Sequence, residues 1–304
     1  MTEAFINQNI LPTDPIESKK YRAACPSGLK YTNEKSTIPA MHHPITSAVR
    51  LWALVVASFA PGVLSAAAAP AAAAPKVLIY TRNHVTSGKG FVHDNIAVSV
   101  AAVRELCTEK TIGSDVSDDP AVFTAANLRN YRAVIFCNSN NEAFSEPAQS
   151  AAFTSYIEAG GGFVGIHSAS GSERRNPDFK RILGGTFKWH TPYQPFSVVV
   201  ADPKHPATAG LPAAWPWTDE GYLCDLVPDL HVLLEMDTTS VANPPREKWV
   251  LKFEGNRFPL SWCHQVGKGR CFYTALGHAK AAYADPALRK HIQGGILWVL
   301  DMAK

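Results

Sequence analysis

The sequence predicts an α/β fold built around a parallel sheet, and three observations carry this prediction. Short apolar segments alternate with amphipathic helical segments over residues 76–170, an alternation that is typical of parallel strands joined by right-handed crossovers. Three glycines, 160–162, separate a helical pattern from the apolar segment 163–166, which suits a strand buried on both faces. The apolar character then stops abruptly at His167, at the carboxyl end of a strand, where ligands of open α/β sheets bind.

The first half of the domain follows from local patterns. We expect strands over 77–80, 111–116, 133–136 and 163–166, and a short helical turn over 127–131. A helix should begin at His93 or Asp94, because apolar residues then recur on one face at Ile96, Val100, Val103 and Cys107. Another helix should begin at Pro147 and end at Gly160, since proline suits the first turn and glycine the end. The strands 77–80, 133–136 and 163–166 should be adjacent and parallel.

The second half has a different character. A helix is expected over 176–183, ended by Gly184. Strand-like segments then follow closely, at 196–200, 231–234, 249–253, 259–262 and 270–273. Their spacing predicts an added antiparallel portion of the sheet. The last helix should have Asp285 as its N-cap and Pro286 at its first position.

The first 75 residues are predicted to lie outside the folded domain, which would span 76–304. Residues 1–40 show no periodic pattern and are interpreted as an upstream extension. Residues 41–75 have the parts of a secretory signal that starts near Met41, with the apolar segment 51–60 followed by alanine-rich cleavage positions. That segment is short for a membrane span, which needs about 20 residues. We therefore expect a periplasmic or secreted protein with no stable span after cleavage. An uncleaved membrane anchor is the alternative.

Charge and cysteine content narrow the choice of partners. The net charge of +3 is small for 304 residues, and no basic run is interleaved with aromatic residues, so nucleic acid is not an expected partner. The sequence does not indicate an oligomeric state. Of the six cysteines, Cys25 precedes the signal, and export would place the other five in an oxidising compartment. Cys263 and Cys271 lie symmetrically about Gly267, and we expect them to face each other across a hairpin; two separate buried thiols are the alternative.

Several polar residues stand at the ends of predicted segments. His93 precedes a helix, His167 follows a strand, His278 follows another strand, and Asp219-Glu220 lies between two apparent strands. Because the loops of a parallel sheet gather at one edge, we expect His93, Glu220 and His278 to converge on His167 at the floor of a cleft. For each residue taken alone, a surface hydrogen bond is the alternative, and His167 could simply cap its strand. No His-Glu-x-x-His, Cys-x-x-Cys or Gly-x-Ser-x-Gly motif is present.

Five segments together carry a resemblance to a known family. They are Phe91 to Ile96, Gly160 to Ala169, Asp202 to Thr208, Thr218 to Tyr222, and Gly267 to Arg270 with Thr274 to His278. In this order they resemble the motifs of ThuA-like proteins, named after trehalose utilisation. The resemblance implies a flavodoxin-like sheet with helices on both faces, as in class I glutamine amidotransferases. It also implies a setting in sugar metabolism, often beside oxidoreductases that make 3-keto-glycosides.

The chain departs from the family pattern at two positions. Phe258 stands where the family often has histidine, and Gly221 stands where an aromatic residue is frequent. The first change removes one candidate polar residue from the pocket. Amidotransferase activity is disfavoured, because it needs an activated thiolate and no cysteine lies beside His167.

The resulting hypothesis is an exported enzyme that acts on a sugar or a 3-keto glycoside by acid/base or metal-assisted hydrolysis or elimination. The candidate catalytic residues are His93, His167, Glu220 and His278. The candidate substrate contacts are His190, Asp219 and Tyr222. A divalent metal such as zinc would be held by His93, His167 and His278. Replacing His167 should then abolish turnover with little loss of stability, as a cleft residue contributes little packing. A non-catalytic carbohydrate-binding or accessory protein is the alternative.

Overall fold

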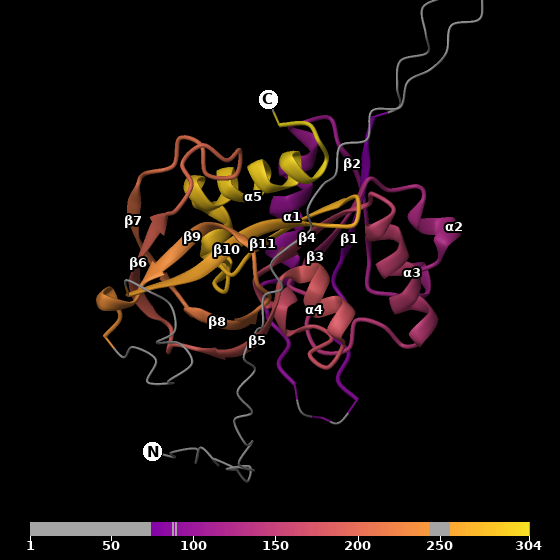
Figure 1. Ribbon diagram of the computed structural model, residues 1–304, viewed down its shortest axis with the longest axis horizontal. Helices are drawn as coiled ribbons and strands as arrows, with labels where there is room; N and C mark the ends of the chain where they lie inside the picture. Colours follow the sequence, from indigo (N-terminus) through magenta and orange to yellow (C-terminus); the bar gives the residue numbers. More distant parts are fainter. Residues whose placement is uncertain (1–73, 87, 89, 243–255, 304) are drawn as a thin grey trace, which may run out of the picture. The chain divides into compact units, whose positions relative to one another are not determined.

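A mixed sheet of nine strands is the framework of the computed structural model, which describes residues 74–303 except 87, 89 and 243–255 (Figure 1). The order of the strands is β2-β1-β3-β4-β11-β10-β9-β6-β7, and β5 pairs with β8 in a separate ribbon. The strands are β1 (Lys76–Tyr80), β2 (Gly113–Ser117), β3 (Ala133–Cys137), β4 (Gly162–Ile166), β5 (Gly185–His190), β6 (Gln194–Val200), β7 (Ala214–Asp219), β8 (Tyr222–Leu226), β9 (His231–Asp237), β10 (Arg257–Val266) and β11 (Gly269–Thr274). The described residues belong to one compact unit, Ala68–Lys304.

Helices cover both faces of this sheet, as the resemblance implied. The α-helices are α1 (Ile96–Thr108), α2 (Ala125–Leu128), α3 (Pro147–Glu158), α4 (Pro177–Leu183) and α5 (Pro286–Val299). Helix α1 packs beside α5, while α3 packs beside α2 and α4. Figure 1 shows these two groups on opposite sides of the sheet. The predicted helix signals hold at α5, where the Asp285 carboxylate accepts from the backbone N–H groups of Ala287 and Leu288, and at α4, which ends at Gly184 with φ +93°.

The parallel half of the sheet matches its prediction. Strand β1 pairs in parallel with β2 and β3, and β3 pairs in parallel with β4. Every residue of β3 and β4 is buried, as expected for strands covered on both faces. The prediction that residues 270–273 belong to the antiparallel portion of the sheet is only partly right. These residues lie in β11, which joins the two halves of the sheet because it pairs in parallel with β4 and antiparallel with β10.

The antiparallel portion consists of β10, β9, β6 and β7. It contains the predicted segments 196–200, 231–234 and 259–262. The predicted strand over 249–253 lies outside the described residues. The apparent strands on either side of Asp219-Glu220 are β7 and β8.

The predicted disulfide between Cys263 and Cys271 is wrong, since both are free thiols. Strand β10 sets Cys263 opposite Phe272, and β11 sets Cys271 opposite His264. Neighbouring residues of a strand point to opposite faces of the sheet, so the two thiols face away from each other. The hairpin turns over residues 267–268, and its centre therefore lies between these two residues rather than at 267.

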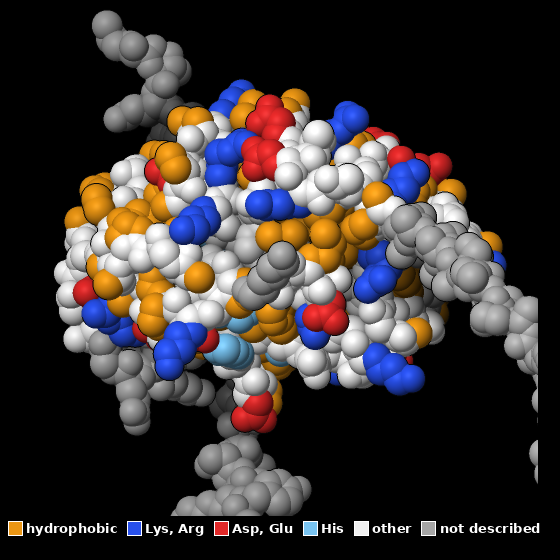
Figure 2. Space-filling view, turned by 90° about the horizontal axis from the view of Figure 1, so that it is seen from above, with side chains coloured by type: hydrophobic (Ala, Val, Ile, Leu, Met, Phe, Trp, Pro, Cys, Tyr) orange, Lys and Arg blue, Asp and Glu red, His pale blue; other side chains and the backbone are white. Residues whose placement is uncertain are grey.

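The surface of the molecule is mixed in charge. On the face shown in Figure 2, Lys and Arg side chains are interspersed with Asp and Glu side chains. That face presents no continuous strip of one sign, which fits the small net charge. Among the helices that the structure describes, none has both the length and the apolar character needed to cross a membrane.

Candidate functional site

His167 follows β4 at a sharp turn of the backbone. Its φ is +46°, in the left-handed region that non-glycine residues rarely adopt. Two contacts hold it there: its Nδ1 lies 2.7 Å from the carbonyl oxygen of Ala275, and the Tyr273 hydroxyl donates to the His167 carbonyl oxygen at 2.8 Å. Backbone strain of this kind persists only where the surrounding structure enforces it, and such positions cluster at functional sites.

The other site residues come from three further loops. His93 lies between β1 and α1, His278 follows β11, and Glu220 lies between β7 and β8. The Asn95 side chain ties two of these loops together, because it donates to the carbonyl oxygens of Gly277 and His278, each at 2.8 Å. The carboxyl ends of the parallel strands thus bring His93, His167 and His278 to one edge of the sheet, and the connection between β7 and β8 adds Glu220.

Asp219 is the internal anchor of the site. Its carboxylate is completely buried and accepts hydrogen bonds from the Trp217 indole at 2.9 Å and the Glu220 N–H at 2.9 Å. It also accepts from the N–H groups of Gly277 at 2.8 Å and His278 at 3.2 Å. One carboxylate therefore fixes the backbone that carries both Glu220 and His278. Direct substrate contact by Asp219, as the sequence suggested, is disfavoured by this burial.

The four side chains meet closely. The Nε2 atoms of His93 and His167 are 3.2 Å apart, and Nδ1 of His278 lies 3.1 Å from a carboxylate oxygen of Glu220. One ligand atom from each of the four residues lies within 4.8 Å of the others. In a tetrahedral zinc site, bond lengths of about 2.0–2.1 Å put neighbouring ligand atoms about 3.3 Å apart. The cluster therefore needs only small side-chain shifts to surround one ion.

The protonation states of His93 and His167 suit metal ligands. Burial lowers the pKa of both His93 and His167 to about 3, so both imidazoles are neutral at pH 7. The contact of Nδ1 of His167 with the Ala275 carbonyl favours a proton on that nitrogen, which leaves the Nε2 lone pair facing the cluster. Contact with Glu220 raises the pKa of His278. Burial opposes ionisation of Glu220, but His278 and His190 outweigh it and lower its pKa.

A cleft of about 320 Å³ opens onto this cluster. Its lining residues are Phe91, His93, Asn140, Ser168, Gly171, Arg174, Phe187, His190, Glu220 and Tyr222. The candidate substrate contacts His190 and Tyr222 thus face the cleft. Nδ1 of His190 lies 3.5 Å from Glu220 Oε1, and the Tyr222 hydroxyl lies 3.4 Å from Nε2 of His93.

His167 lies beneath the cleft rather than on its floor. Its side chain is completely buried and packs on the Tyr222 ring with centroids 4.3 Å apart. The premise that His167 contributes little packing is therefore wrong.

The sequence analysis did not predict Ser168, Arg174 and Phe187 as residues of the cleft. Ser168 could have been found from its place directly after His167, whereas nothing local marks the other two.

The structure shows the surroundings of Phe258 and Gly221, the two residues that depart from the family pattern. Phe258 is completely buried on β10 and is not among the residues that line the cleft. At Gly221, an added Cβ would lie 2.6 Å from the Met236 sulfur and 3.0 Å from Oγ1 of Thr191. A side chain at position 221 would therefore require Met236 and Thr191 to shift.

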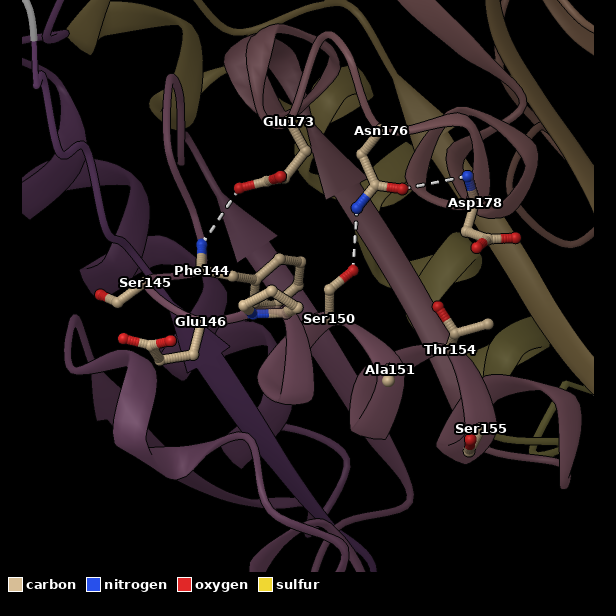
Figure 3. Close-up of a pocket in the computed structure, with 11 residues that line it drawn as sticks. Phe144, Ser145, Glu146, Ser150, Ala151, Thr154, Ser155, Glu173, Asn176 and Asp178 are labelled. Carbon is tan, nitrogen blue, oxygen red and sulfur yellow. Dashed lines mark hydrogen bonds between the residues drawn. The ribbon is translucent and has the colours of Figure 1, made fainter.

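A second hollow lies over the start of α3 (Figure 3). Its polar groups bind one another: Glu173 accepts from the Phe144 N–H at 3.1 Å, and Asn176 donates to Ser150 at 2.8 Å and accepts from the Asp178 N–H at 3.0 Å. These hydrogen bonds hold the loop before α3 and the first turn of α4. The polar residues of the hollow therefore have a structural role and do not indicate a ligand site.

Comparison with known proteins supports the assignment drawn from the motifs. The chain matches the ThuA family, described as trehalose utilisation, over residues 76–299. A ThuA-like protein from Bacteroides uniformis is similar in structure with a TM-score of 0.60 and 26% identity, and the match covers 77% of this chain and 95% of that one. Among proteins with curated descriptions, none matches this chain.

A second ThuA-like protein, from Parabacteroides merdae, shares the fold. Its TM-score is 0.58 at 19% identity, and the match covers 75% of this chain and 90% of that one. The family match extends from the start of β1 to the end of α5. It therefore includes all four residues of the cluster, and the chain belongs to the ThuA family.

Proposed function

We propose that this protein is a carbohydrate-metabolism enzyme that acts on a sugar or a 3-keto glycoside by metal-assisted hydrolysis or elimination. One observation carries the proposal: ligand atoms of His93, His167, Glu220 and His278 lie within 4.8 Å of one another beside a cleft. The family description, trehalose utilisation, links the chain to carbohydrates. Three histidines and one carboxylate form a donor set typical of zinc.

Each residue has a role that its environment favours. His93, His167 and His278 would hold a divalent metal such as zinc, with Glu220 beside them. Such an ion would polarise the carbonyl or a hydroxyl of the sugar. Glu220 has a lowered pKa and so is ionised at pH 7, the state in which a carboxylate can accept the proton from the carbon beside a 3-keto group. Burial raises the pKa of Tyr222 well above its ordinary value, so its hydroxyl keeps its proton and can donate a hydrogen bond to a substrate oxygen.

Export completes the proposal. The pattern of residues 41–75 supports secretion or a periplasmic location. Mass spectrometry of the protein recovered from the producing cells tests this. We expect a mature N-terminus between residues 65 and 76, and recovery of chains that retain Thr2 would contradict cleavage.

The test of activity uses a 3-keto glucoside with a chromogenic aglycone. We expect the purified protein to release the aglycone faster from this compound than from the parent glucoside. Chelation should abolish the release, and zinc should restore it. Glu220→Gln should reduce it by at least about 100-fold, as for a general base, whereas His231→Gln, at an exposed histidine, should not. Binding of the compound without any turnover would instead favour a carbohydrate-binding protein.

A further inference from the structure

Arg174 brings an unpaired positive charge to the cleft. Its Nε donates to the Gly171 carbonyl oxygen at 3.1 Å, and its guanidinium lies over the Phe187 ring, 5.0 Å from the centroid. Among the described residues, no carboxylate forms an ion pair with it. The two contacts hold the plane of the guanidinium while its terminal Nη atoms are left without a hydrogen-bond acceptor in the described chain. An arginine held in this way is prepared to bind a carboxylate or a phosphate.

Ser168 supplies a second, independent observation in the same cleft. The residue is only 1% exposed, and its hydroxyl has no hydrogen-bond partner among the described residues. It nevertheless lines the cleft together with Arg174. Because an unpaired buried hydroxyl costs about 1–3 kcal/mol, such groups in native proteins call for an explanation. A ligand oxygen in the cleft would supply the missing partner.

The other charges near the cleft do not neutralise Arg174. Glu220 is directed to His278 and His190. Arg174 also borders a neighbouring hollow that contains Glu142 and Glu173. Glu173 accepts from the backbone N–H groups of Ala143 and Phe144, and Glu142 lies 3.8 Å from His84. The cleft thus keeps a positive charge on one wall.

We propose that Arg174 and Ser168 bind an anionic oxygen group of the substrate, so that the cleft selects an acidic sugar over a neutral one. The group is a carboxylate or a phosphate, because both accept paired hydrogen bonds from a guanidinium fork. Arg174 and Ser168 then determine specificity, and the His93 cluster acts on another part of the same molecule. The inference rests on the proposed function for its site, but its test measures binding alone.

The test compares binding of D-glucuronate, D-glucose 6-phosphate and D-glucose to the full chain by titration calorimetry. The protein is first freed of metal, so that an ion cannot itself bind the anionic group. We expect at least one acidic sugar to bind about tenfold or more tightly than glucose, as for a hydrogen bond to a charged group. The two acidic sugars distinguish carboxylate from phosphate.

Variants then test whether Arg174 and Ser168 cause the preference for acidic sugars. Arg174→Ala should bind all three sugars alike, Arg174→Lys should keep part of the preference, and Ser168→Ala should weaken the acidic sugar alone. The matched control is Arg175→Ala, at an exposed neighbour that does not line the cleft, and it should leave the preference intact. The inference would be overturned if the wild type bound acidic and neutral sugars equally or bound none of them. It would also be overturned if Arg174→Ala weakened the binding of acidic and neutral sugars by the same factor. If the protein turns over a neutral 3-keto glycoside but shows no preference for acidic sugars, the proposed function holds and this inference is wrong. If it prefers acidic sugars but turns over no 3-keto glycoside, this inference holds and the proposed function is wrong.

Discussion

The Nε2 atoms of His93 and His167 lie 3.2 Å apart, although 74 residues separate the two histidines in the chain. Both imidazoles are neutral at pH 7, because burial lowers the pKa of each to about 3. Because Nδ1 of His167 faces the Ala275 carbonyl, its Nε2 carries a lone pair, and a hydrogen bond at this distance places the proton on Nε2 of His93. A metal ion would take the place of that hydrogen bond, with the proton of His93 moved to its Nδ1. This relationship is the basis of the metal predictions.

The metal-free protein is expected to bind about one zinc ion per chain and to gain thermal stability with the logarithm of the free zinc concentration once that exceeds the dissociation constant. His93→Ala should weaken zinc binding by at least about tenfold, because one ligand of the set is lost. Calorimetric titration with zinc measures the affinity, and His231→Ala is the control, since His231 is exposed and pairs with Asp202. Unchanged zinc affinity in His93→Ala would contradict the proposed ligand set.

His167→Asn should abolish turnover with a smaller loss of stability than His167→Ala. Asparagine tolerates the φ of +46° better than alanine does, and it leaves a smaller cavity under Tyr222. We expect His167→Ala to lower the free energy of unfolding by about 1–3 kcal/mol. Denaturant titration of both variants measures the difference. If both variants are as stable as the wild type, the strain and packing at His167 have been overstated.

Asp219→Asn is expected to disturb the positions of Glu220 and His278. An amide nitrogen would face donors that now bind the carboxylate, and at least one buried N–H would lose its partner, at a cost of about 1–3 kcal/mol. Zinc affinity should fall as well, because Glu220 and His278 lose their common anchor. Asp225→Asn, which affects an exposed carboxylate paired with Lys180, should change neither quantity. A variant that keeps full zinc affinity would show that Asp219 does not position the cluster.

Stability should fall as the pH drops below neutrality, partly because of His291. This histidine is completely buried, between the Ala207 carbonyl and the Ser261 hydroxyl, and burial lowers its pKa from 6.5 to about 4. The unfolded chain therefore binds more protons than the folded one between pH 6.5 and 4, and the stability contribution is lost as the pH falls through that window. For His291 alone the loss between pH 7 and 5 is roughly 2 kcal/mol.

Denaturant titration at several pH values tests this effect. The variant His291→Gln should show a shallower decline in the free energy of unfolding over the same window, whereas His231→Gln should decline like the wild type. The same slope in His291→Gln and the wild type would mean that His291 does not contribute to the pH dependence.

Gly269→Ala should prevent stable folding. An added Cβ would lie 2.3 Å from the carbonyl oxygen of Ile157 and 2.6 Å from that of Gly161, and neither backbone atom can move without shifting α3 or the loop before β4. At Gly113, the nearest atom to an added Cβ is a Lys76 side-chain carbon at 3.4 Å, so Gly113→Ala should be almost neutral. The yield of soluble protein and the unfolding midpoint compare the two variants. Equal stability would contradict the tight packing of the hairpin against α3.

The sequence by itself determined the parallel half of the fold. Strands β1, β3 and β4 are marked by continuous apolar segments, and α5 is marked by Asp285 and Pro286 at its start. These signals are local, because burial on both faces of a strand and the unpaired N–H groups of a helix end constrain residues close together in the chain. His167 and His278 stood out for a similar reason, since a polar residue that follows an apolar strand lies at the sheet edge. His93 was marked by its place before a helix, and Glu220 by its place between two strands.

Only the tertiary structure decided which of these polar residues face the cleft. A one-residue difference in the pairing register of the hairpin places Cys263 and Cys271 on opposite faces, and spacing alone does not fix such a register. Asp219 and His167 became buried because hydrogen bonds from remote loops enclose them. Arg174 forms no ion pair with a described carboxylate, and its guanidinium lies over the Phe187 ring instead. Contacts between distant segments decide burial and charge pairing, and these depend on the packing of the whole sheet rather than on any local pattern.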